Sequence, residues 1–285
     1  MGVLPKPTAH GPALVLRVWP CRETSVIASL LTRDHGFVKV LARGVRQPGS
    51  RLRPLVEPGR LIEAEFSLDA ERDLQFLRGG NVELDPMSGE PTLEKSAFLQ
   101  GALELIDRCG PLDEGDERTG TADLFAVCEQ FVRVLSSSSC RGPALLFFAF
   151  EWELLARHGM APEIESCISC GTQLAELTGA TLWFSPGEGG VLCEDCSRRG
   201  SAGKRPLGAT ALGYLRNLSR LGLAQNLDEP LPRAMRREIG SALHHFLGYH
   251  LPAYRLPRAL ELLRRPRTVP VTAPVPDNQG NLKET

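Results

Sequence analysis

Four cysteines constrain this chain more than any other feature of its sequence. Cys167 and Cys170 form one Cys-x-x-Cys pair, and Cys193 and Cys196 form a second pair after an interval of 22 residues. Each pair holds two thiolates close enough to share one ion, and two pairs together supply the tetrahedral shell that structural zinc prefers. Gly171 follows the first pair and allows the backbone to turn tightly beneath the metal. The spacing therefore predicts a four-cysteine zinc module.

The interval between the two pairs is typical of a small β-ribbon. Residues 181–184 are apolar and β-prone, residues 185–190 have the composition of a turn, and residues 191–192 lead back to the second pair. The alternative is a pair of disulfides. The first dozen residues contain several prolines and no apolar core of a signal peptide, so we expect a cytoplasmic chain. Thiols stay reduced in that compartment, and this favours zinc.

A shell of four protein ligands leaves no position open for a water molecule. We therefore expect one structural zinc ion without a catalytic role. The remaining cysteines stand singly and are expected to be buried as small apolar residues. They are Cys21, Cys109, Cys128 and Cys140.

The 285-residue chain has a net charge of −1, but its charges are segregated along the sequence. The net charge is +4 over residues 1–80, −8 over residues 81–160, −4 over residues 161–200 and +7 over residues 201–285. Basic ends attract a polyanion locally, whatever the total charge. No apolar run reaches the roughly 18 residues of a membrane-spanning helix, so we expect no membrane association.

Short β-type runs dominate the first part of the chain. We expect strands over residues 13–19, 25–32, 36–42, 59–66 and 73–77. A tight hairpin turn joins the second and third runs, where Gly36 is free to take positive φ. Five short strands in about 70 residues match the size of an oligonucleotide-binding (OB) fold.

The loop after the third run is expected to contact nucleic acid. Arg43, Arg46, Arg51 and Arg53 alternate there with glycine and proline, and Lys39 precedes them on the strand. Guanidinium groups on a flexible backbone suit phosphates at variable register. The alternative is a solvated loop that is basic for solubility. The few nearby aromatic residues are expected in the core, so that binding would depend on phosphate contacts and salt. They are Trp19, Phe37, Phe66 and Phe76.

Helical periodicity follows a linker over residues 85–91. Thr92 is a candidate N-cap for the first helix, and residues 143–157 are apolar nearly all round, which predicts a central buried helix. Two clusters of potential metal ligands have simpler interpretations. The acidic run from Asp113 to Glu117 is typical of a solvated loop. His244, His245 and His250 lie near a predicted helix C-terminus, which favours cations.

The predicted fold is an α+β multidomain protein. It has an N-terminal OB-fold β-barrel and a C-terminal all-α domain with an inserted four-cysteine zinc ribbon. The expected boundaries are a flexible head over 1–12, the OB-fold domain over 13–84, helical segments over 85–166 and 198–265, the zinc module over 167–197, and a disordered tail over 266–285.

Several motifs of this chain resemble the RecO family of bacterial recombination mediators. The resemblance runs from about Ala13 to Leu263, and the four-cysteine module contributes to it. Its other parts are Leu14-Val-Leu-Arg17, Glu23-Thr-Ser25, Leu30-Leu-Thr-Arg-Asp-His-Gly36, Ala42-Arg-Gly-Val-Arg46, Ser50-Arg-Leu-Arg53 to Pro58, and Phe246-Leu-Gly-Tyr-His250.

The resemblance implies a non-enzymatic DNA repair protein of the cytoplasm, associated with the nucleoid. Such a protein binds single- and double-stranded DNA and anneals complementary strands. With its partner RecR it helps load the RecA recombinase onto DNA coated by single-strand binding protein, whose acidic C-terminal tail many members bind. The family's DNA-binding loop corresponds here to Lys39, Arg43, Arg46, Arg51 and Arg53.

This chain departs from the family in the strong acidity of residues 81–160. We therefore expect the acidic tail to bind the basic segment 198–220 instead. One rival function is a zinc-ribbon scaffold that binds only protein. Another is a nuclease or zinc hydrolase, which would need paired carboxylates or histidine ligands in a cleft.

Overall fold

The computed structural model describes residues 7–109, 117–176, 181–199, 203–224 and 229–264. Its N-terminal strands close into an OB-like barrel with the strand order β1-β2-β3-β5-β4. The pairs are antiparallel except β3 with β5. The strands are β1 (Thr8–Cys21), β2 (Ser25–Thr32), β3 (Gly36–Ala42), β4 (Leu61–Ser67) and β5 (Leu74–Leu84), with a short 3-10 turn η1 (Arg53–Val56) after β3.

The first strand begins earlier than the sequence suggested. Residues 8–12, which we expected within a flexible head, form the start of β1 and pair with β4. The pairing of β1 with β2 begins only at Ala13, so Pro12 lies where β1 has a single partner strand. A proline, which has no N–H to donate, is tolerated in such a position. The proline and glycine content of the segment therefore hid a real strand.

The fifth strand is also longer than the expected run over residues 73–77. A pair of glycines lets it continue across β4, because Gly80 has φ +144° and a side chain there would lie 2.1 Å from the Glu63 carbonyl oxygen. Only glycine combines that backbone conformation with so close an approach. The extension completes the closure of the barrel.

The helical region packs around one central helix. Helix α3 (Pro143–Arg157) is buried on almost every side, as its apolar sequence predicted. Thr92 caps α1 as expected, because its Oγ1 accepts a hydrogen bond of 3.0 Å from the Lys95 amide. The other helices are α1 (Leu93–Cys109), α2 (Glu117–Ser136), α5 (Ala209–Leu221), α6 (Arg233–His250) and α7 (Arg258–Arg264), with a 3-10 turn η4 (Gly222–Ala224).

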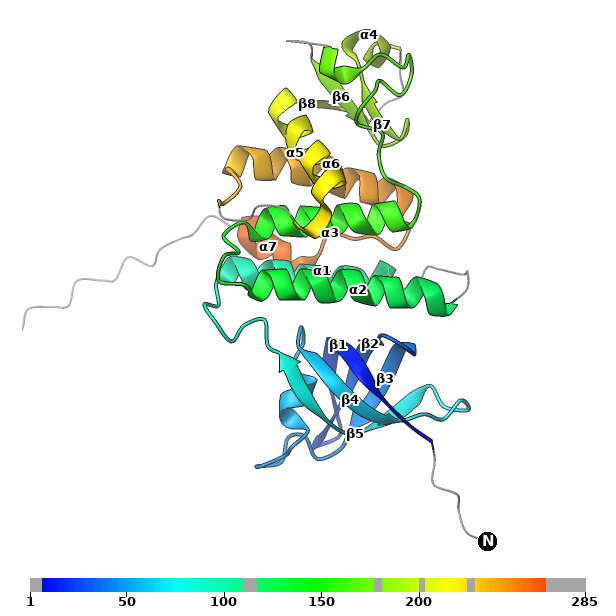
Figure 1. Ribbon diagram of the computed structural model, residues 1–285, viewed down its shortest axis with the longest axis vertical. Coiled ribbons are helices and arrows are strands. Elements are labelled where there is room, and N and C mark those ends of the chain that lie inside the picture. The colour runs from blue at the N-terminus through cyan, green and yellow to red at the C-terminus, as the bar shows by residue number, and fades with distance from the viewer. Residues whose placement is uncertain (1–6, 110–116, 177–180, 200–202, 225–228, 265–285) are drawn as a thin grey trace, which may run out of the picture.

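A small sheet lies at the end of the molecule opposite the barrel (Figure 1). Its order is β7-β6-β8, built from β6 (Leu182–Ser185), β7 (Gly190–Leu192) and β8 (Arg205–Leu207). The β6–β7 ribbon is the predicted one. Strand β8 lies within the basic segment 198–220, for which the sequence analysis gives no strand. The sheet is accompanied by the one-turn helix α4 (Glu194–Ser197) and a 3-10 turn η3 (Leu174–Glu176).

The barrel and the helices share a hydrophobic core. Leu14, Leu16, Leu31 and Leu61 of the barrel are buried in the same cluster as the helical side chains. Helices α1 and α2 form the layer next to the barrel (Figure 1). The core of the small sheet β7-β6-β8 is continuous with that cluster through residues such as Phe184. None of the helices in the described ranges is long and apolar enough to cross a membrane.

Candidate metal centre and nucleic-acid interface

The structure brings the four predicted cysteines together. The Sγ atoms of Cys167, Cys170, Cys193 and Cys196 all lie within 4.8 Å of one another. The Sγ atoms of Cys170 and Cys193 are 3.8 Å apart. Four sulfurs around zinc at about 2.3 Å would be about 3.8 Å apart in a regular tetrahedron. The donor set and its spacing therefore fit a four-coordinate zinc ion.

Backbone geometry around the first pair explains how the loop closes. The Cys167 amide donates to the Thr172 carbonyl at 2.8 Å, and the Gly171 amide donates to the Cys167 carbonyl at 2.8 Å. Gly171 has φ +74°, which a residue with a side chain adopts at a cost. The Cys193 amide donates to the Cys167 sulfur at 3.3 Å, which links the two pairs.

The environment separates the acidities of the sulfurs. Hydrogen bonds from the side chain and backbone of Thr172 lower the pKa of Cys170 to about 6. Ser169 lowers the pKa of Cys196, but the neighbouring sulfurs of Cys193 and Cys170 outweigh it and raise that pKa to about 12. Hydrogen bonds to Cys170 therefore favour the thiolate, the form in which cysteine binds a metal.

Three of the remaining cysteines have described side chains, and these lie outside the sulfur cluster. Cys128 and Cys140 are buried in the helical core, as expected. Cys21, which we also expected to be buried, is only half-buried at the end of β1. The side chain of Cys109 lies outside the described residues. Among those residues, the four sulfurs form the one group of three or more potential ligands close enough to hold a metal ion.

The predicted basic loop lies between β3 and the η1 turn. Arg43, Arg46, Arg51 and Arg53 are all exposed there, and Lys39 is exposed on β3. The Arg46 amide donates to the Thr24 carbonyl at 3.0 Å, so the loop is held against the β1–β2 turn. In the described part of the chain, these five side chains form no ion pair. Their positive charges are therefore available to an anionic partner.

The aromatic residues of the barrel differ in position. Phe66 is buried inside the barrel and Phe37 packs against the helical core. Trp19 and Phe76, which we expected in the core, are only half-buried. The Arg43 guanidinium carbon lies 4.4 Å from the Phe76 ring centroid, so a residue of the basic loop stacks on one of these rings.

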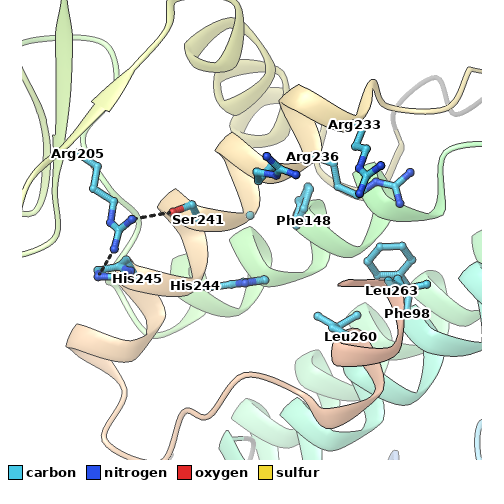
Figure 2. Close-up of a pocket in the computed structure, with 12 residues that line it drawn as sticks. Phe98, Phe148, Arg205, Arg233, Arg236, Ser241, His244, His245, Leu260 and Leu263 are labelled. Atoms are coloured by element: carbon cyan, nitrogen blue, oxygen red, sulfur yellow. Dashed lines mark hydrogen bonds between the residues drawn. The ribbon is translucent and has the colours of Figure 1, made fainter. Parts of the chain in front are cut away.

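A second basic surface, which no local sequence pattern predicts, occurs in the helical region. A cavity of about 730 Å³ opens between α6, α7 and the helices beneath them. Its apolar wall contains Phe98 and Phe148, together with Leu260 and Leu263 of α7 (Figure 2). Side chains far apart in the sequence form this wall, so periodicity alone could not reveal it.

The rim of the cavity is cationic. Figure 2 shows Arg233 and Arg236 near Phe148, and Arg237 belongs to the same lining. Arg236 forms an ion pair with Glu94 at 2.8 Å, but among the residues described Arg233 and Arg237 form none. Only Arg205 comes from segment 198–220, in which the sequence placed the acidic-peptide site.

A buried acid–base pair lies beside the cavity. Glu151 of α3 is completely buried, and its Oε1 lies 3.2 Å from Nε2 of His244, which lines the cavity. Burial raises the pKa of Glu151, while His244 acts in the opposite direction. Arg205 donates to Nε2 of His245 at 3.1 Å, and burial followed by the charge of Arg205 lowers the pKa of His245. His245 is therefore a neutral acceptor at pH 7.

In the part of the chain that the structure describes, the three histidines near the end of α6 do not form a group that could hold a metal ion. His244 contacts a carboxylate of another helix, which the sequence did not indicate, whereas His250 approaches the Pro186 carbonyl oxygen at 3.0 Å. Residues 113–116 of the acidic run lie outside the described residues.

Comparison with known proteins gives a consistent result over both parts of the chain. A family model described as "Recombination protein O N terminal" matches residues 8–83, and one described as "Recombination protein O C terminal" matches residues 90–259. These two matches cover the barrel and most of the helical region.

Individual relatives from several bacteria are named as RecO proteins. The "DNA repair protein RecO" of a Nocardioides species is 31% identical over 243 residues, which cover 84% of this chain and 93% of the relative. That of Desulforudis audaxviator is 31% identical over 258 residues, with 89% and 95% covered. That of Bacillus pumilus is 26% identical over 262 residues, with 88% and 94% covered. The chain therefore belongs to the RecO family of DNA repair and recombination proteins.

Proposed function

We propose that this protein is a non-enzymatic recombination mediator of the cytoplasm, acting at the nucleoid. It binds single- and double-stranded DNA, anneals complementary strands and, with RecR, helps load RecA onto DNA coated by single-strand binding protein. The observation that carries the proposal is the group of five cationic side chains on β3 and its following loop, which form no ion pair within the described ranges. Family membership supports the same role.

The chemistry of the loop suits a phosphate backbone. Guanidinium groups form paired, charge-assisted hydrogen bonds with phosphate oxygens, and the glycines let successive arginines adjust to the strand. Each phosphate contact releases condensed counterions, so five contacts on a single strand give a slope of about −3.5 in a plot of log K against log salt. The slope counts the contacts directly.

The test is a titration of a fluorescent oligonucleotide at several salt concentrations. In the double variant Arg43→Ala, Arg51→Ala we expect weaker binding and a slope nearer about −2.1. The matched control is Arg141→Ala with Arg258→Ala, two exposed arginines of the helical region. An unchanged slope in the loop variant would remove the loop from the interface. Absence of binding at low salt would favour a scaffold that binds only protein.

We also infer that the four cysteines hold one structural zinc ion. The four sulfurs within 4.8 Å of one another support this assignment, and they would fill all four positions of a tetrahedral shell with protein ligands. The ion would fix the ribbon to the helical region without activating water.

The cavity beside α6 is the proposed site for the acidic C-terminal tail of single-strand binding protein. A cationic rim around an apolar wall suits a peptide that combines carboxylates with an apolar side chain. We expect the variant Arg233→Ala, Arg237→Ala to lose binding of a labelled tail peptide while it keeps its affinity for naked DNA. It should also lose annealing of coated strands. The Arg141→Ala, Arg258→Ala variant is again the control, and equal peptide binding by both variants would place the tail elsewhere.

A further inference from the structure

The outer surface of the barrel carries a continuous row of apolar side chains. Strand registers place Trp19 of β1 opposite Ile27 of β2, Ile27 opposite Leu41 of β3, and Leu41 opposite Phe76 of β5. All four are half-buried, whereas their neighbours Val26 and Ala28, Val40 and Ala42, and Gln75 and Leu77 point inward and are buried. The row therefore crosses four strands on one face.

The helical region covers only part of this face. Farther along β2 and β3, Leu31 and Phe37 face the same way and pack into the helical core. Ser29 is the next position on β2, and its Oγ lies 3.5 Å from Asp107 of α1. The row from Trp19 to Phe76 lies beyond this contact, so its half-exposed side chains face solvent.

Cations accompany both aromatic ends of the row. Arg43 and Arg78 have their guanidinium carbons 4.4 and 5.5 Å from the Phe76 ring centroid. Arg17, which also lies 3.8 Å from Asp107 of α1, is 5.8 Å from the ring centroid of Trp19. Lys39 is exposed on the neighbouring outward position of β3. An apolar row with aromatic ends and a cationic border is complementary to a strand whose bases are apolar on their faces and whose backbone is anionic.

We propose that Trp19, Ile27, Leu41 and Phe76 form a stacking platform for the unpaired bases of single-stranded DNA. The inference rests on the proposed function, in which the adjacent loop holds the phosphates, and it adds a contact that distinguishes single strands from duplexes. Base faces are accessible in a single strand but covered by their neighbours in a duplex. An arginine stacked on an aromatic ring adds a second planar surface for a base.

The platform explains how a phosphate-binding loop could select single strands. Phosphate contacts alone are insensitive to the bases and give similar salt-dependent binding to any strand. Stacking depends on the presence of bases and hardly on salt. The two contributions can therefore be measured separately on the same protein.

The experiment compares three labelled probes of equal length: an oligothymidylate, a strand of abasic sites with the same phosphates, and a duplex. We expect the full-length protein to bind the oligothymidylate more tightly than the abasic strand. Trp19→Ala and Phe76→Ala should each weaken binding to the oligothymidylate about tenfold and leave the abasic strand, the duplex and the salt slope unchanged. Trp19→Leu and Phe76→Leu keep apolar volume without an aromatic face, and should give the same loss if the alanine variants fold poorly.

Phe37→Leu is the matched control, because Phe37 is an aromatic residue of the same barrel covered by the helical core. Its affinity for all three probes should equal that of the unchanged protein. Equal affinity of the unchanged protein for abasic and base-containing strands would overturn the platform while leaving the proposed loop contacts intact. Failure to bind any of the three probes would instead overturn the proposed function itself.

Discussion

Loss of one of the four cysteines proposed to bind zinc should destabilise the helical region and leave the barrel folded. The variant Cys193→Ser removes one of four sulfurs, and structural zinc sites contribute about 10–16 kcal/mol of apparent binding free energy in small zinc modules. The small sheet β7-β6-β8 has strands of only three or four residues, and its own packing cannot replace that contribution. We therefore expect the ribbon to unfold when the ligand is lost.

The loss of stability of the helical region can be estimated from one contact between the small sheet and α6. Phe184 of β6 is 1% exposed, and its ring centroid lies 5.5 Å from that of Phe246 of α6. Exposing a side chain of this size costs about 1.5–3 kcal/mol. For a unit of this length, about 2–4 °C of melting temperature corresponds to 1 kcal/mol, so the helical transition should fall by about 3–12 °C.

The assay combines zinc content per chain with calorimetry and hydrogen exchange. Zinc should be absent from Cys193→Ser, exchange should accelerate in α6, and exchange in the barrel strands should be unchanged. Cys21→Ser is the control, because this half-buried cysteine lies on the barrel away from the sulfur cluster. An unaltered helical transition together with one zinc ion per chain would refute the ligand assignment. Loss of zinc without a change in melting would refute the coupling through Phe184.

Three further predictions concern stability. Burial raises the pKa of Glu151. The protonated carboxyl therefore contributes to the free energy of unfolding at low pH, and this contribution is lost as pH rises through the pKa of the folded state. The variant Glu151→Gln should therefore melt at a temperature that depends less on pH between acid and neutral conditions; equal pH dependence would contradict this reading. Gly80→Ala should destabilise the barrel by more than about 1 kcal/mol in denaturant titrations, because its Cβ would lie 2.1 Å from the Glu63 carbonyl oxygen. Thr92→Ala should lower the free energy of unfolding by about 1 kcal/mol, because α1 loses its N-cap hydrogen bond. Thr92→Ser keeps the hydroxyl and should retain the stability of the unchanged protein.

Local sequence signals predicted the elements whose partners are close in the chain. Strands β2 and β3 have the bounds expected from their apolar runs, because Gly36 at φ +65° joins them in a hairpin. Helix α3 also has the expected bounds, since a segment that is apolar all round can only be buried. The cysteine spacing likewise predicted the sulfur cluster, because two short knuckles and one ribbon fix its geometry.

Features that depend on distant partners could not be predicted in the same way. Residues 8–12 and β8 have the composition of loops. Residues 8–12 form a strand because they pair with β4, and β8 forms because it pairs with β6. The cavity beside α6 needs Phe98 of α1 and Leu263 of α7 to meet. The outward position of Trp19 and Phe76 follows from strand register, and a shift of one residue would have placed both rings inside the barrel.

The interface between the barrel and the helices explains part of the acidity of residues 81–160. Asp107 of α1 lies 3.8 Å from Arg17 of β1, and Glu129 of α2 lies 3.2 Å from Arg33 after β2. The Arg33 guanidinium also lies 5.2 Å from the Phe125 ring centroid. Such pairs at the domain boundary orient the barrel more than they stabilise it, because partly exposed ion pairs contribute little free energy.

The orientation has a consequence for DNA binding. Carboxylates of α1 and α2 pair with Arg17 and Arg33 at the edge where the barrel meets the helices, whereas the loop cations and Lys39 form no ion pair with the described residues. The barrel therefore has a neutralised edge against the helices and a cationic side toward solvent. A DNA strand attracted to the barrel would be directed to the loop and away from the acidic helical layer. The acidity that distinguishes residues 81–160 is thus compatible with a DNA-binding role, because it lies where it positions the basic surface.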